Sequence, residues 1–300
     1  MKRLFLILCL VASLVLPMVV YSVGTTTLVP NVVRGMDGSM SFFLTLTATA
    51  DSSDATFVPV LIDQNTNAGA YADIYGKWMT SARTTIPLAI HAPTANYDIY
   101  IVDGVNATSD FVLTTPTLAI GTTASQVSTI AFNYVINNVS YAKTAVAAGT
   151  APGNDIIPQS KYGAVALDIG ANGTIDAIEA SGNAAGTYTS AALAIAGVAA
   201  AASDHVRLGY VTATKSDGAF TFGTTALNVA NSTVAYTSTI PQYDIMGGRL
   251  TNRSATVNQE VYPANTAGDN AYIYIKKPIM IIPVNNSVNS AVFTLDLIFN

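Results

Sequence analysis

The chain has 300 residues, of which half are hydrophobic and only a tenth are charged. Thirteen Lys and Arg stand against eighteen Asp and Glu, so the formal net charge is −5. An acidic chain whose sequence shows no basic cluster is a poor binder of nucleic acid, and we expect no nucleic-acid partner. The charged fraction is below that of an ordinary soluble surface, which predicts that the chain assembles with copies of itself.

The N-terminus has the pattern of an export leader over residues 1–22. A basic start precedes the apolar run Leu4–Leu16, and Ser22 offers a small-residue cleavage site. The alternative is a retained membrane anchor, because Leu4–Val23 is about as long as a bilayer requires. Contact with a membrane is therefore expected only through residues 1–23, and only if they are not cleaved.

Short alternating segments, separated by turn residues, fill most of the chain. Ile130–Ile136 and Val139–Val146 flank the Asn137-Asn138 pair, which predicts a β-hairpin. Such strands recur roughly every ten residues, as they do in β-sandwiches and jelly rolls. The exception is Ser190–Ala202, an Ala-rich stretch that predicts a short helix capped by Ser190. The predicted fold class is all-β, with β-sandwich or jelly-roll domains and one short Ala-rich helix.

Changes in composition divide the chain into segments. Ala147–Ser160 is rich in Gly, Pro and small residues, as linkers are. We predict the leader or anchor at 1–22, an N-terminal β domain at 23–146, the linker at 147–160, a middle β module at 161–240 and a C-terminal β segment at 241–300. The last strand alternates as Ser41–Thr49 does, so we expect it to complete the N-terminal sheet. Its apolar alternate positions, the candidate assembly strand, are Phe293, Leu295, Leu297 and Phe299.

An ordered series of segments within residues 161–238 is similar to a known module. The series is KYGAVALDIGANGTIDAI, then HVRLGYVTAT, then GAFTFGTTALNVANSTVAYTS. It resembles a module of predicted tailed-phage virion structural proteins and covers about a quarter of the chain. The resemblance implies a virion structural role, as a decoration, fibre or capsid-associated protein, and it implies no catalytic residues.

The segment Val165–Gly182 admits two interpretations. A twelve-residue calcium loop would place ligands at Asp168, Asn172, Asp176 and Glu179. Gly170 stands at another ligand position and offers no side-chain oxygen, and the flanks alternate like strands. We therefore predict no metal or cofactor, but a hairpin in which Asn172 and Gly173 take the positive-φ positions of a tight turn. The residues sharing its buried face are then Val165, Leu167 and Ile169.

The sequence carries no motif typical of catalysis. The only two histidines, His91 and His205, have no helix-spaced metal partner, and no G-x-S-x-G elbow occurs. We interpret Asp204 as a turn residue rather than as an acid that orients His205. We predict that the protein is not an enzyme.

Aromatic residues gather in the segment YADIYGKWM. Tyr71, Tyr75 and Trp78 could form a carbohydrate-binding platform, but packing in the core or a subunit contact is the favoured use.

Three functions remain open, in descending order of support. The first is a non-enzymatic structural subunit of a virion that self-assembles through β-rich contacts. The second is a secreted subunit of a cell-surface filament or layer, assembled by strand exchange. The third is a carbohydrate-binding exoprotein. The expected location is accordingly the virion or the cell surface and exterior, with copies of the chain and other virion or surface proteins as partners.

Overall fold

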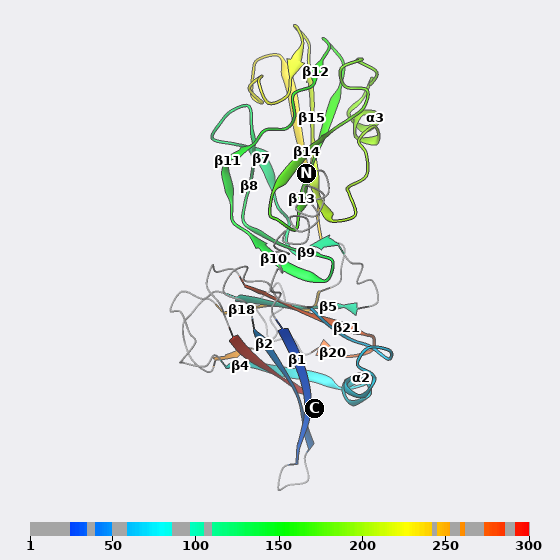
Figure 1. Cartoon of the computed structure of the whole chain (residues 1–300), viewed down its shortest axis with the longest axis vertical. Coiled ribbons are helices and arrows are strands. Elements are labelled where there is room, and N and C mark those ends of the chain that lie inside the picture. The colour runs from blue at the N-terminus through cyan, green and yellow to red at the C-terminus, as the bar shows by residue number, and fades with distance from the viewer. Residues whose placement is uncertain are drawn as a thin grey trace, which may run out of the picture.

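The computed structural model describes residues 25–34, 40–49, 59–85, 97–104, 110–241, 245–252, 259–261, 273–285 and 292–299. The predicted leader and His91 lie outside the described residues. The described residues form antiparallel sheets with two short helices, which confirms the all-β prediction. The two ends of the chain build the lower part of the molecule, and the middle of the chain builds the upper part (Figure 1).

Two sheets make up the lower part. Sheet I has the strand order β1-β2-β22-β4-β19, with β20 also paired to β4. Its strands are β1 (Thr25–Arg34), β2 (Met40–Thr49), β4 (Trp78–Thr85), β19 (Gln259–Val261), β20 (Ile273–Tyr274) and β22 (Val292–Phe299). Sheet II has the order β18-β5-β21-β3. Its strands are β3 (Val60–Ile62), β5 (Tyr97–Asp103), β18 (Ile245–Asn252) and β21 (Ile279–Asn285).

These sheets have the strand order of a jelly roll. Apart from β1 and β20, each sheet contributes four of the described strands. In chain order the first pairs with the last, β2 with β22, and the second with the seventh, β3 with β21. The third pairs with the sixth, β4 with β19, and the fourth with the fifth, β5 with β18. An antiparallel ribbon folded back on itself in this way and rolled into two sheets is a jelly roll.

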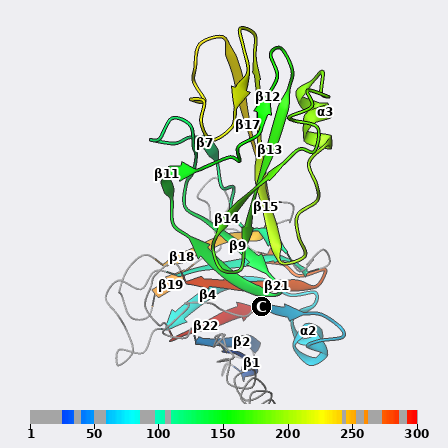
Figure 2. The same ribbon diagram turned by 45° about the horizontal axis from the view of Figure 1, so that its top comes forward.

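A large module is inserted at the point where this ribbon turns back, between β5 and β18. Its sheets have the orders β10-β9-β6, β11-β8-β7, β12-β16 and β14-β13-β15-β17. The elements are β6 (Phe111–Val112), β7 (Leu118–Ile120), β8 (Val127–Thr129), β9 (Phe132–Ile136), β10 (Val139–Lys143), β11 (Val146–Thr150), β12 (Ile156–Ile157), β13 (Gly163–Gly170), β14 (Ile175–Glu179), α3 (Ala191–Ala196), β15 (His205–Lys215), β16 (Phe220–Thr221) and β17 (Ser232–Ser238). Figure 2 shows it standing on the layered sheets of the jelly roll.

The inserted module begins earlier than the sequence predicts. One buried cluster joins Val112 and Phe132 to Leu167 and Phe220, so residues on both sides of position 146 share a core. The predicted domain boundary at residue 146 therefore falls inside the module. The predicted linker 147–160 contains most of β11 and all of β12, both of which are paired in sheets. Its glycines make bends with positive φ rather than a flexible connection.

The predicted Asn137-Asn138 hairpin and the predicted Ala-rich helix both form, but their lengths differ from those that the sequence predicts. Asn137 and Asn138 have φ of 50° and 58° and join β9 to β10, as a tight hairpin turn requires. The Ala-rich helix α3 is capped by Ser190, whose side chain accepts from Leu193 N at 3.3 Å. It ends at Ala196, short of Ala202, where Gly197 forms the C-cap and Val198 packs against the cluster that contains Ala164 of β13.

A second helix, α2 (Ala68–Ile74), lies between β3 and β4 and was not predicted. It has only seven residues and buries Ala70, Tyr71 and Ile74. So short an element gives too little periodicity for recognition in the sequence, and tertiary packing of its apolar side stabilises it.

Sheet II is covered on both faces. Every residue of Ile279–Val284 is buried, and alternate side chains of a strand point to opposite faces. On the face toward the module, Tyr100 and Ile282 pack with Leu113 and Val135. The neighbouring Ile281 points to the other face and is equally buried. Burial on both faces explains why this strand is a nearly continuous apolar run instead of an alternating one.

Candidate functional site

The segment proposed as either a calcium loop or a hairpin forms a hairpin. In β13 and β14, Asp168 lies opposite Asp176 and Ile169 lies opposite Ile175. Gly173 N donates to Gly170 O at 3.0 Å, and Gly170 N donates to Thr174 O at 3.1 Å. The connection is therefore a three-residue loop that ends in Gly173 with φ +73°. The predicted two-residue turn is wrong, since positive φ occurs at Gly173 alone and not at Asn172.

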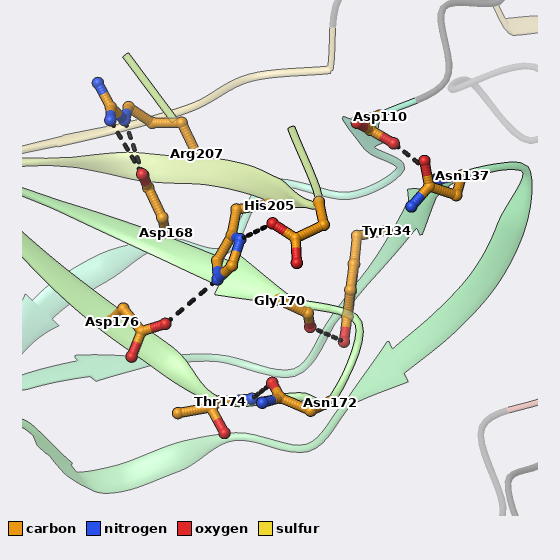
Figure 3. Close-up of polar contacts among 11 residues, drawn as sticks. Asp110, Tyr134, Asn137, Asp168, Gly170, Asn172, Thr174, Asp176, His205 and Arg207 are labelled. Atoms are coloured by element: carbon orange, nitrogen blue, oxygen red, sulfur yellow. Dashed lines mark hydrogen bonds and ion pairs between the residues drawn. The ribbon is translucent and has the colours of Figure 1, made fainter. Parts of the chain in front are cut away.

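Each of the four candidate calcium ligands has its own protein partner, as Figure 3 shows for Asp168, Asn172 and Asp176. Asp168 is paired with Arg207, and Asn172 Oδ1 accepts from Thr174 N at 2.8 Å. Asp176 contacts the imidazole of His205. Glu179 lies at the far end of β14, where its Oε1 accepts from the backbone N–H groups of residues 154 and 155. Among the described residues, no group of three or more His, Cys, Asp or Glu is arranged to hold a metal ion.

Arg207 and Asp168 form an ion pair on the face of β13 that α3 covers. A β-bulge between β13 and β15 shifts the register so that Arg207 stands directly opposite Asp168. Arg207 also donates to Tyr210 Oη at 3.0 Å and to the carbonyl of Ala199 at 2.8 Å. The hydrogen bonds that Arg207 donates to Asp168 raise the pKa of Arg207 despite its partial burial. The pair therefore fastens the segment after α3 to the sheet.

His205 lies between two carboxylates, at the first position of β15. Its Nδ1 is 2.7 Å from Asp204 Oδ1, and its Nε2 is 3.2 Å from Asp176 Oδ2. Asp204 lies in a turn, as the sequence predicts, and its carboxylate in addition contacts the imidazole, which the sequence did not predict. Both ring nitrogens are engaged, so neither is open to take a proton from a substrate.

The hairpin loop between β13 and β14 contacts β9 and β10, the strands through which the module contacts the jelly roll. Tyr134 Oη donates to Gly170 O at 3.4 Å, and Lys143 Nζ donates to Gly173 O at 2.7 Å. From the same pair of strands, Ser140 Oγ donates to the carbonyl of Pro283 in β21 at 2.5 Å. A continuous series of polar contacts thus connects the module's main sheet to sheet II.

The candidate assembly strand is β22, and it lies in the middle of sheet I. It is paired on one side with β2 and on the other with β4. Its register sets Leu295 opposite Leu46 and Phe299 opposite Phe42. The chain's own strand occupies this central position, which leaves no gap between β2 and β4 for a strand from a neighbour.

The aromatic segment divides between the core and the surface. Tyr71 is buried in α2, whereas Tyr75 and Trp78 are 54% and 50% exposed. Packing in the core, one of the two favoured uses, therefore holds for Tyr71 alone. The ring of Trp78 contacts that of Tyr274, with 4.9 Å between centroids.

Comparison with protein families, with curated proteins and with solved structures finds no match to this chain. In the described part of the chain, no helix is long and apolar enough to span a bilayer.

Proposed function

We propose that the protein is a non-enzymatic structural subunit of a virion, whose jelly roll takes part in the shell and whose inserted module projects from it. The observation that carries this proposal is the pairing of β2 with β22, β3 with β21, β4 with β19 and β5 with β18. Jelly rolls of this order occur in viral capsids, and also in lectins and cupins.

The place of the insertion supports the capsid role among these alternatives. The module interrupts the ribbon only at its turn, and it stands on one face of sheet II (Figure 2). Among the described strands, none of the module pairs with an edge strand of either jelly-roll sheet, which favours contacts between neighbouring subunits at the sides of the jelly roll. The low charged fraction of the chain favours such contacts, since a subunit in a shell hides much of its surface.

Assembly by strand exchange is less well supported, because β22 already fills the centre of sheet I. The engaged nitrogens of His205 likewise support a structural role over a catalytic one.

The experiment that tests the proposal is assembly of the purified chain lacking residues 1–22. We expect sedimentation to show concentration-dependent oligomers, and electron microscopy to show rings or closed particles with knobs on one side. A truncated chain that stays monomeric throughout the micromolar range would contradict the proposal. Genes for portal, terminase or tail proteins beside the coding gene would support it independently.

A further inference from the structure

β17 lies at an edge of the main sheet of the inserted module. In the strand order β14-β13-β15-β17, its only described partner is β15. Directly before the strand, Ser216 N donates to Asn231 O, and hydrogen-bonded pairs then alternate along an antiparallel ladder. The backbone N–H and C=O groups of Val234 and Tyr236 therefore point away from β15. Within the described part of the chain, these groups have no hydrogen-bond partner.

The two edges of this sheet differ in how they are protected against pairing with another chain. On β14, the opposite edge, Asp176 carries a charge, and the Glu179 carboxylate accepts from the backbone N–H groups of residues 154 and 155. In contrast, Ser232–Ser238 contains no charged residue and no Pro or Gly. Charges, prolines and covering segments are the features that normally protect an edge strand. The sequence of β17 thus does not oppose pairing.

The sequence of β17 is nearly the same in both directions. Ser232–Ser238 reads STVAYTS, so inversion about Ala235 exchanges Ser with Ser, Thr with Thr, and Val234 with Tyr236. Two antiparallel copies of the strand, related by a twofold axis at Ala235, would bring the outward backbone groups of Val234 to those of Tyr236 in the partner. Thr opposite Thr, and an aromatic opposite a β-branched residue, are favourable cross-strand pairs. The strand is therefore complementary to itself.

The side chains of β17 leave this edge accessible and hold it rigid. Thr233, Ala235 and Thr237 are exposed on one face of the strand. On the other face, Val234 and Tyr236 pack against the core cluster of the module. All seven residues are paired with β15. A strand that is already extended and fixed loses little conformational freedom when a second strand pairs with it.

We propose that two copies of the chain pair edge to edge through β17, about a twofold axis at Ala235, and that their four-stranded sheets join into one continuous sheet. The inference rests on the proposed function and names one contact of the assembly, in which the projecting modules associate in pairs. A twofold contact uses the same surface on both partners, and a self-complementary strand provides such a surface. Each copy keeps all its own strands, so no strand is exchanged.

A cysteine at position 235 tests both the pairing and its register. Cys9 is the only cysteine, so a chain lacking residues 1–22 has no other thiol. Across the axis, the two Cα atoms at position 235 would lie about 4.5 Å apart, which a disulfide can bridge. We expect Ala235→Cys to form a disulfide-linked dimer under mild oxidation, as measured by non-reducing electrophoresis.

Thr233→Cys is the matched control, because Thr233 is exposed on the same strand. In the proposed register it lies opposite Thr237 of the partner, and the two copies of position 233 are about 14 Å apart, too far for a disulfide. We expect Thr233→Cys to stay unlinked, and the double variant Thr233→Cys with Thr237→Cys to link.

Sedimentation velocity over a range of protein concentrations measures the strength of the contact. Ala235→Lys would set two ammonium groups opposite each other at the axis, so we expect it to weaken dimerisation roughly tenfold. Ala192→Lys adds the same charge at an exposed alanine of α3 and should leave dimerisation unchanged.

The outcomes separate this inference from the proposed function. If the wild type assembles but Ala235→Cys stays unlinked, the contact is overturned and the proposed function stands. Linking of Thr233→Cys as fast as that of Ala235→Cys also overturns the contact, because the register is then wrong. A wild type that forms dimers alone, which Ala235→Lys dissociates, supports the contact and contradicts the role in a shell. A wild type that never associates contradicts both.

Discussion

Arg207 and Asp168 form a two-point ion pair, with Arg207 Nε 2.7 Å from Asp168 Oδ1 and Nη2 2.9 Å from Oδ2. The Asp168 side chain is only 2% exposed, and that of Arg207 is 16% exposed. Planar guanidinium and carboxylate groups in this arrangement bind with high geometric specificity. The pair therefore determines how the segment around α3 lies on β13.

Replacing Arg207 should destabilise the protein strongly. In Arg207→Met the Asp168 carboxylate stays buried without its cation, which should lower the free energy of unfolding by about 3 kcal/mol. This value is at the lower end of the range for buried ion pairs, because the Arg207 side chain is partly exposed. Urea unfolding measures the loss. The double variant Asp168→Leu with Arg207→Met should recover most of it, since no buried charge then remains. A loss below about 1 kcal/mol in the single variant would contradict the role assigned to the pair.

His205 should make stability depend on pH. Burial lowers its pKa, but the hydrogen bonds to Asp204 and Asp176 outweigh this effect and raise the pKa above the usual value. Only the doubly protonated ring can donate to both carboxylates. The folded state therefore binds the proton more tightly than the unfolded chain. The stability that this proton contributes is fully present below the pKa that His205 has in the unfolded chain. It is lost as the pH rises through the higher pKa that His205 has in the folded protein.

Thermal unfolding between about pH 5 and pH 8 measures this dependence. His205→Gln should remove the His205 part of the slope, and Asp176→Asn should reduce it. A wild-type slope that His205→Gln leaves unchanged would show that the contacts with the two carboxylates do not stabilise the fold. The sequence has only two histidines, so an NMR titration can follow the imidazole signals of each and measure the pKa of His205 directly.

Deleting Val292–Asn300 should abolish soluble folding. The deletion removes β22 from between β2 and β4, and it leaves the facing backbone groups of both strands unpaired. Circular dichroism and solubility after expression measure the effect. A peptide with the sequence of the missing strand, added in trans, should restore folding. A truncated chain that melts and assembles as the full chain does would contradict the central position of β22.

The inserted module should fold on its own. Residues 110–241 contain the core that joins Val112 and Phe132 to Leu167 and Phe220, and no described strand of the jelly roll takes part in the sheets of the module. We expect residues 110–241 to unfold cooperatively on heating. Separation exposes the apolar side chains that meet sheet II, including Leu113 and Val135, so the isolated module should self-associate more than a polar variant at these positions. A non-cooperative transition would contradict the assignment of a separate core.

The sequence determined the elements whose causes are local. Alternation predicted strands and the all-β class, Asn137-Asn138 predicted its hairpin, and Ser190 predicted the start of a helix. In each case a side chain or a backbone preference within a few residues determines the outcome. The shared alternation of Ser41–Thr49 and Val292–Phe299 even indicated that the two ends of the chain meet, because neighbouring strands of one sheet often share a pattern of alternation.

Only the tertiary structure decided which distant residues share a core or a contact. The glycines and prolines of residues 147–160 fit a flexible linker as well as they fit a pair of short strands, so the sequence does not distinguish these structures. The burial of Ile157 in the folded protein does. The β-bulge that sets Arg207 opposite Asp168 depends on the partner strand, so the spacing of the charges in the sequence does not show it. The same holds for the lysines around Tyr274 and Trp78. They are separated by about 200 positions in the chain, and the two segments that carry them come together only because β20 pairs with β4.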